Sequence, residues 1–305
     1  MEYMKVSEAA RKWGISPRRI RVLCRDKRIP GVTRNGNLYM IPADARKPED
    51  GRVSEATKRQ ALLQMLSQVD DRLSALQQCR PLTAGEAERL HGEFAVEFTY
   101  NSNAIEGNTL TLKETARVLE GITIDQKPLK DHLEAIGHRD AFLYIEDVAK
   151  KELPLSESVI KNIHSLVLMD RPEDKGVFRR IPVSIVGAYT EPVQPYQIEP
   201  MLTKLLAENE NRRKTMHVIE RIARFHLEFE GIHPFIDGNG RTGRLILNLD
   251  MIRNGFPPVN VKFSDRRRYY DAFDAYYRDG NADVMTELLA EYVLERLNEY
   301  LRVLK

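Results

Sequence analysis

Apolar residues recur at helical spacing along most of this chain. One run has them every three or four positions, at Leu62, Leu63, Met65, Leu66, Val69, Leu73 and Leu76. That spacing places them on one face of a long amphipathic helix. The same pattern predicts helices near residues 85–106, 112–120, 128–150, 156–169, 196–210, 214–230, 239–253, 265–278 and 282–303. Residues 57–305 are therefore predicted to form a mainly α-helical bundle.

One segment of this body departs from the helical pattern. In GVFRRIPVSIVGAYTEPVQP, apolar residues alternate among glycines and prolines over residues 180–195. Such alternation between turn formers is typical of paired strands. We therefore expect a small exposed β-hairpin inserted in the bundle.

The first 46 residues contain shorter elements. Ser7 is expected to cap a helix that carries Trp13 and ends at Gly14. Ser16 and Pro17 then supply the N-cap and the first-turn proline of a second helix. Two helices joined by a glycine turn are typical of helix-turn-helix proteins.

The second of these helices is strongly basic. The side chains expected to point outward are Arg18, Arg19, Arg21, Arg25 and Lys27. A helix in this position can enter the major groove, where arginine neutralises phosphates and reads guanine edges. Beyond it, Asn35-Gly36 joins extended stretches at residues 29–34 and 38–42, which predicts a hairpin.

Residues 6–42 thus resemble the small winged helix-turn-helix domains of the MerR and excisionase type. The resemblance implies that residues 1–46 bind duplex DNA through Arg18, Arg19, Arg21 and Arg25. A basic helix that docks on the rest of the chain, or on a protein partner, would explain the same charges. Residues 47–56 are predicted to be a linker.

Composition agrees with this division and excludes several classes of protein. The 305 residues are 42% hydrophobic and 30% charged, with a mean hydropathy of −0.45, as in folded globular proteins. Residues 1–52 hold 13 Lys or Arg against 6 Asp or Glu, and the remainder holds 34 against 39. No apolar run approaches a membrane span or an export signal, so we expect a cytoplasmic protein without membrane contact. Two cysteines cannot build a disulfide scaffold.

A phosphate-binding pattern lies in HPFIDGNGRTGR, residues 233–244, between two predicted helices. Gly238 and Gly240 allow the main chain to approach a ligand closely, and the free amides around Asn239 at the helix start face an anion. Arg241 and Arg244, three residues apart, can reach further phosphate oxygens.

Two neighbouring residues complete a reaction centre. Asp237 is a hard oxygen ligand, suited to Mg²⁺ held jointly with phosphates. His233 can take up a proton near neutral pH and can therefore act as a general base. Together these residues indicate transfer of a phosphorus-containing group from a nucleotide. Phe235 and Ile236 are expected to anchor the loop in the core.

The segment matches the Fic family signature at every specified position, and the resemblance extends over roughly residues 90–300. It implies AMP transfer from ATP, with Mg²⁺, to a Ser, Thr or Tyr hydroxyl of an unknown target protein or of the chain itself. His233 would be the base and Asp237 the metal ligand. The implied phosphate-binding residues are Gly238, Asn239, Gly240, Arg241 and Arg244.

The same resemblance assigns two further regions. The hairpin becomes a flap that binds a target's backbone by strand addition, near Ile181, Val183, Ile185 and Gly187. Similar proteins surround the nucleoside with residues placed like Tyr269, Tyr270 and Tyr277, for which helix packing is the alternative role.

Upstream, TYNSNAIEGNTL contains Ser102, Glu106 and Gly107 in the pattern of the Fic inhibitory helix, expected at about residues 97–108. The implied mechanism is a pairing of Glu106 with Arg244 that makes ATP bind unproductively. Capping of the helix end is the simpler role for Ser102 or Asn108.

Other functions remain compatible with these residues. The chain could be a DNA-binding transcriptional regulator with the Fic body as a sensor or scaffold. It could also use another donor for UMP, GMP or phosphocholine transfer, or remove AMP. The sequence does not determine the target, the operator or the oligomeric state, and a homodimer is one of the states left open.

Overall fold

The computed structural model describes residues 3–36, 38–48, 51–185 and 189–304, with backbone only for residues 51–55. Contacts between residues divide the chain into one unit of residues 1–60 and a second of residues 61–305. Residues 51–56, predicted to belong to a linker, are helical, because α3 (Gly51–Gln77) begins at Gly51. Beyond Gly51 this helix contains no glycine or proline that would interrupt it.

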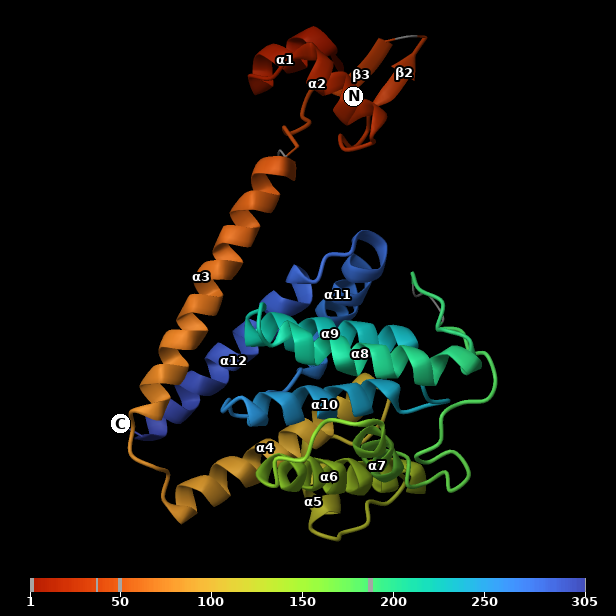
Figure 1. The fold of residues 1–305 in the computed structure, drawn as a ribbon. Coiled ribbons are helices and arrows are strands. Elements are labelled where there is room, and N and C mark those ends of the chain that lie inside the picture. The colour runs from red at the N-terminus through yellow and green to blue at the C-terminus, as the bar shows by residue number, and fades with distance from the viewer. Residues whose placement is uncertain (1–2, 37, 49–50, 186–188, 305) are drawn as a thin grey trace. The chain divides into compact units, whose positions relative to one another are not determined.

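The first unit combines two helices with a three-stranded antiparallel sheet (Figure 1). Its elements are β1 (Tyr3–Lys5), α1 (Val6–Trp13), α2 (Pro17–Arg25), β2 (Thr33–Asn35) and β3 (Leu38–Pro42), with β3 between the other two strands. Asn35 pairs with Leu38, so the predicted hairpin is confirmed. β1 escaped sequence analysis because three residues are too few to show a period. Trp13, Ile20 and Ile41 lie in the core of this unit.

Local signals set the ends of both helices in this unit. Gly14 ends α1 with φ 63°, and the Ser16 hydroxyl accepts a first-turn N–H of α2 at 3.2 Å, as predicted. The prediction that Ser7 caps α1 is wrong, because the helix begins at Val6 with Lys5 as its N-cap. The Glu8 carboxylate stabilises this start by accepting the Lys5 N–H at 2.7 Å.

The helices of the second unit lie close to the predicted ranges. After the end of α3 they are α4 (Ala84–Ile105), α5 (Leu112–Leu119), α6 (Leu129–Lys150), α7 (Glu157–Val167), α8 (Ile198–Arg212), α9 (Val218–Ile232), α10 (Asn239–Arg253), α11 (Arg266–Asp279) and α12 (Asp283–Leu304), with 3₁₀ turns η1 (Pro195–Gln197) and η2 (Phe263–Asp265). Hydroxyls of Thr83, Thr111 and Ser156 cap α4, α5 and α7. Across the described ranges, none of the helices combines the length and the apolar character needed to span a bilayer.

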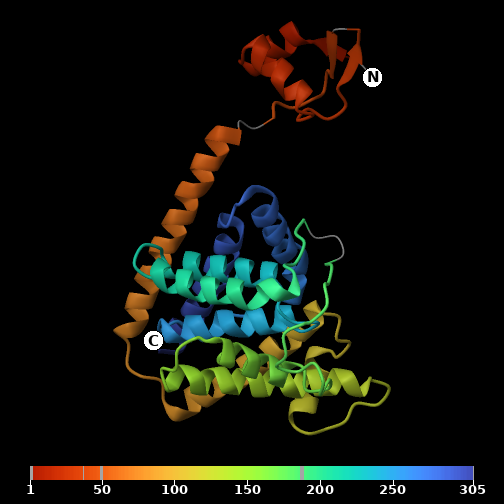
Figure 2. The ribbon, with the colours of Figure 1, turned by 45° about the vertical axis from the view of Figure 1, so that its right-hand side comes forward.

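Helix α10 occupies the middle of the second unit. Figures 1 and 2 show α8 and α9 on one side of it and α4, α6 and α7 on the other. Leu247 and Met251 of α10 pack in one apolar cluster, whereas Leu245 and Leu249 pack in another. Because a helix buried on all sides is held by packing around its whole circumference, the residues at its N-terminus have defined positions.

The β-hairpin predicted at residues 180–195 is not formed by the described residues of this segment. Residues 180–185 and 189–194 contain no strand, and Gly187 lies outside the described residues. Pro182 and Pro192 lack the N–H that a strand ladder requires. The guanidinium of Arg179 instead donates to carbonyls on both sides of the segment.

Candidate active site

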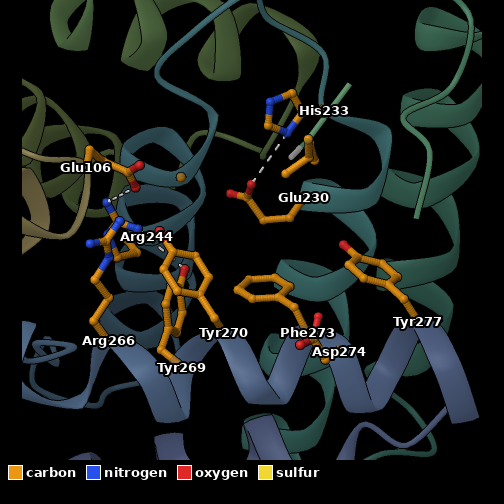
Figure 3. Close-up of a pocket in the computed structure, with 12 residues that line it drawn as sticks. Glu106, Glu230, His233, Arg244, Arg266, Tyr269, Tyr270, Phe273, Asp274 and Tyr277 are labelled. Atoms are coloured by element: carbon orange, nitrogen blue, oxygen red, sulfur yellow. Dashed lines mark hydrogen bonds and ion pairs between the residues drawn. The ribbon is translucent and has the colours of Figure 1, made fainter. Parts of the chain in front are cut away.

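His233 ends α9 in an unusual backbone conformation. The helix continues to Ile232, where the sequence predicted an end near residue 230, and His233 follows with φ 51°. A residue other than glycine in this region costs about 1–3 kcal/mol and must be held by its surroundings. Buried Arg179 holds His233 in this conformation. Its side-chain Nε–H donates to the His233 carbonyl at 2.8 Å, and its main-chain N–H donates to the Pro234 carbonyl at 3.0 Å. The imidazole borders a cavity (Figure 3).

His164 of α7, which sequence analysis missed, fixes the loop that follows. Its imidazole stacks on buried Phe235 with ring centroids 3.6 Å apart and 4° between the planes. Nδ1 accepts the Gly176 N–H at 2.9 Å, so Nε2 is left to donate to the Asp237 carbonyl at 2.9 Å. Burial lowers the pKa of His164 to about 4, which keeps the ring neutral. Only the fold brings α7 against this loop.

Asn239, predicted to hold phosphate, uses its side chain to shape the loop. Its Oδ1 accepts the Phe235 N–H and its Nδ2 donates to the Phe235 carbonyl, each at 2.9 Å. Gly238 precedes α10 as its N-cap with φ 75°, a conformation that favours glycine. The first amides of α10 have no acceptor within the helix, which is the arrangement that allows a helix N-terminus to bind an anion.

Arg241 and Asp237 belong to a charged network that also includes Glu134 of α6. Arg241 is buried, with Nη1 2.9 Å from Glu134 Oε1 and Nη2 3.3 Å from Asp237 Oδ1. Asp237 also accepts the Gly238 N–H at 2.6 Å and lies 3.4 Å from Arg171 Nη1. Burial opposes ionisation of Asp237, but Arg241 and the Gly238 N–H outweigh it and lower the pKa of this carboxyl. The Asp237 carboxylate is therefore ionised and offers oxygen atoms that can ligate a cation.

Arg244 is buried, and α4 binds its guanidinium. Nε donates to Ser102 Oγ at 2.9 Å, and Nη2 donates to the Ser102 carbonyl and to Glu106 Oε1, both at 2.7 Å. Nη1 lies 3.4 Å from the Tyr269 hydroxyl. The missing side chain of Gly240 makes room for Glu106, since a Cβ there would lie 2.3 Å from Glu106 Oε1. The structure thus contains the contact between Glu106 and Arg244 that the motif implied.

A cavity of about 460 Å³ lies between these elements (Figure 3). The predicted site residues that line it are Glu106, Ile185, His233, Gly240, Arg244, Tyr269, Tyr270 and Tyr277. Gly238, Asn239, Arg241 and Asp237 are not among its lining residues. His233 and Arg244, whose guanidinium binds Glu106, therefore border the same cavity.

The three tyrosines of α11 that were predicted to surround the nucleoside line the cavity and also pack against their neighbours. The Tyr269 hydroxyl lies 2.7 Å from His226 Nε2, and the Tyr277 hydroxyl donates to the Leu227 carbonyl at 2.7 Å. Tyr270 is 40% exposed. Sequence analysis missed further lining residues, namely Glu230, Arg266, Phe273 and Asp274. Spacing of three and four along α11 could have grouped the last three with the tyrosines.

Burial also sets the charge of the imidazole at this site. It lowers the pKa of His233 to about 4, so the ring is neutral at physiological pH. A neutral imidazole beside an anion-facing helix terminus can accept a proton from a hydroxyl group. The arrangement suits transfer of a phosphorus-containing group to such a hydroxyl.

Comparison with known proteins identifies the class. The Fic/DOC family model matches residues 154–250. The chain is 32% identical over 245 residues to protein adenylyltransferase Fic of Nematostella vectensis, covering 78% of this chain and 56% of that protein. It is 38% identical over 177 residues to protein adenylyltransferase fic-1 of Caenorhabditis briggsae, covering 57% and 35%. The chain thus spans about a third to a half of the length of these curated relatives.

Solved structures agree with this classification. A portion of Fic-1 from C. elegans superposes with a TM-score of 0.73 at 30% identity, covering 82% of this chain and 74% of that one. A Fic domain containing signaling protein from Bacteroides thetaiotaomicron gives a TM-score of 0.70 at 26% identity, covering 78% and 96%. The helical body therefore has the Fic fold. The chain belongs to the Fic family.

Proposed function

We propose that this chain transfers AMP from ATP to a Ser, Thr or Tyr hydroxyl of a target protein or of itself, releasing pyrophosphate. The observation that carries the proposal is that neutral His233, Gly240 at the N-terminus of α10 and Arg244 all border one cavity. The names of the curated relatives, protein adenylyltransferases, support AMP as the transferred group.

In this reaction His233 accepts the proton of the target hydroxyl as its oxygen attacks the α-phosphorus of ATP. The bond to the bridging oxygen breaks, and pyrophosphate leaves with its electron pair. Amides at the start of α10 stabilise the charge that develops on the α-phosphate, and Arg244 binds an outer phosphate. The packing of α10 on all sides keeps these donors in place before ATP arrives.

Mg²⁺ fits this loop through Asp237. Magnesium commonly takes one or two carboxylates from a protein and fills its other positions with water and phosphate oxygens. Asp237 offers one ionised carboxylate that is partly exposed, with 37% of its side chain accessible. A bound ion would neutralise phosphate charge beside the cavity.

Glu106 is the inhibitory residue in this proposal. Arg244, which would bind an outer phosphate, donates to Glu106 Oε1 and to Ser102. α4 ends at Ile105, Glu106 is its C-cap residue, and Gly107 turns the chain with φ 98°. Because a carboxylate and a phosphate compete for the same guanidinium, ATP can bind productively only after Glu106 moves away.

Intact-protein mass spectrometry tests the donor. The chain is incubated with Mg²⁺ and, in separate reactions, with ATP, GTP, UTP and CTP, and one AMP adduct is expected from ATP. Peptide mapping then locates any self-modification. Ser184 and Tyr189 are candidates, because both are exposed and close in sequence to Ile185, which lines the cavity. An adduct from another nucleotide and none from ATP would contradict AMP as the transferred group.

Binding of duplex DNA by the first unit is a second proposed function, and α2 supports it. α2 follows α1 through a glycine turn, and the hairpin of β2 and β3 follows α2, the order of a winged helix-turn-helix. Arg18, Arg21 and Arg25 are exposed, whereas Arg19 is half-buried. Arg25 pairs with Asp26 at 2.9 Å, so Arg18 and Arg21 are the better candidates for phosphate contacts.

Replacing Arg18 and Arg21 together by alanine is expected to weaken DNA binding by the full chain. It should also reduce the slope of log K against log salt concentration by about 0.9 for each phosphate that the protein no longer neutralises. Fluorescence anisotropy with a labelled duplex at several salt concentrations measures both effects. The double variant Arg89→Ala/Lys204→Ala removes the same charge from the second unit as a control. Equal weakening by the two variants would show a general charge effect and contradict a role for α2.

A further inference from the structure

Glu230 lies on α9 one turn before His233, and the Fic motif assigns it no role in the reaction. Its Oε2 is 3.9 Å from His233 Nδ1, slightly too far for a hydrogen bond (Figure 3). Glu230 Oε1 and His233 Nδ1 are both buried, and by geometry neither makes a hydrogen bond among the described residues. The main-chain carbonyl of Glu230 also faces the imidazole and opposes the effect of burial, which lowers the pKa of His233. Because unpaired buried polar atoms are costly, a small side-chain rotation that joins the two groups is favourable.

Helix α10 makes room for the Glu230 carboxyl. A Cβ on Gly243 would lie 2.5 Å from Glu230 Oε1, just as one on Gly240 would lie 2.3 Å from Glu106 Oε1. Glycines three residues apart share one helix face, so α10 accommodates two carboxyl groups on the same side. Arg244 neutralises Glu106 at 2.7 Å, and His233 is a basic group that lies within 4 Å of the Glu230 carboxyl.

We propose that Glu230 is a positioning residue that determines which nitrogen of His233 carries the proton. An ionised carboxylate can only accept, so it holds the proton on Nδ1 and leaves Nε2 free to act as the base. A neutral carboxyl can donate to Nδ1, which moves the ring proton to Nε2 and removes the base. The consequence for catalysis rests on the proposed AMP transfer, whereas the tautomer itself does not.

The groups around Glu230 decide its charge. Burial, followed by repulsion from Glu106, raises the pKa of Glu230 to about 8, and Arg244 opposes the rise. The other titratable groups around it are His226 on the same helix, α9, and Tyr269, Asp274 and Tyr277 on α11. Removal of Glu106 would lower the pKa of Glu230, so the inhibitory contact also acts on the base.

Imidazole NMR of the full chain without nucleotide tests the tautomer directly. Long-range ¹H–¹⁵N spectra distinguish the two tautomers, and loss of one signal in His233→Asn assigns His233. We expect His233 to change from Nε2–H to Nδ1–H as the pH passes about 8. The change should be absent in Glu230→Gln. It should persist in Glu228→Gln, a control on the same helix whose carboxylate binds Arg212 instead. One tautomer throughout in the wild type, or the same change in Glu230→Gln, would overturn the proposal.

The kinetics distinguish this proposal from the proposed function. If no variant transfers AMP, the proposed function fails and the NMR result stands by itself. In Glu106→Gly, we expect kcat to rise with pH at a lower pH than the tautomer change of the wild type, because Glu106 no longer repels Glu230. Adding Glu230→Gln should abolish this rise and leave KM for ATP unchanged, since Glu230 acts through the base. If the double variant instead bound ATP more weakly and its kcat still rose with pH, the positioning role of Glu230 would be contradicted.

Discussion

Replacement of His233 is expected to lower AMP transfer by roughly 10²–10⁴-fold, the usual contribution of a general base. The physical reason is that the neutral imidazole of His233, which borders the cavity, is the group proposed to take the proton of the attacking hydroxyl. His233→Ala removes the base but puts alanine at φ 51°, where it is strained. His233→Asn is the cleaner variant, because asparagine tolerates this conformation. The initial rate of adduct formation, measured in the Glu106→Gly background, gives the effect.

Two controls separate loss of the base from loss of structure. Thermal unfolding and ATP binding should be nearly unchanged in His233→Asn, since the carbonyl that Arg179 binds is retained. His91→Gln replaces a histidine of α4 that pairs with Glu146 and does not line the cavity, so it should transfer AMP normally. A His233→Asn variant as active as its parent would show that another group is the base.

Glu106→Gly is expected to raise AMP transfer about 10- to 100-fold. Release of Arg244 allows one charge-assisted contact to phosphate, of about 1.5–3 kcal/mol, and each 1.4 kcal/mol corresponds to about a factor of ten. The same change should lower stability by about 1–3 kcal/mol without ATP, because buried Arg244 loses its carboxylate partner. Adduct formation over a range of ATP concentrations and urea unfolding measure the two effects.

Glu106→Gln is the matched variant for this experiment. It keeps the size of the side chain and a hydrogen-bond acceptor for Arg244 but removes the charge, so its rate should lie between those of the wild type and Glu106→Gly. This ordering tests the role of the charge. If Glu106 acted only by ending the helix, Glu106→Gln would transfer AMP at the same rate as the wild type. No gain in Glu106→Gly at any ATP concentration would contradict the inhibitory role of Glu106.

Local signals predicted the helices well and the flap poorly. Apolar spacing located α4 and α6 to α12 because their apolar faces pack in the two clusters around α10, and it located α5 because Val118 packs in a smaller cluster. The cap at Ser16 and the turn at Gly14 were also predictable, since they depend on neighbouring residues. The described residues of segment 180–195 do not form the expected hairpin. Alternation of apolar and polar residues favours a strand but does not provide a second strand to pair with it. Buried Arg179 binds its carbonyls instead.

The sequence by itself determined the helical class and the reactive segment from His233 to Arg244, because close main-chain approach, anion binding and proton transfer need those residue types in that short order. It also supplied Glu106 as a candidate partner of Arg244. Only the tertiary structure decided what each group contacts. Asn239 binds the loop, His164 holds it from α7, and Glu230 faces the imidazole of His233. The bonds that His164 makes to Asp237 and Arg244 makes to Glu106 join segments far apart in the chain. Their geometry arises from packing around α10, which no local pattern encodes.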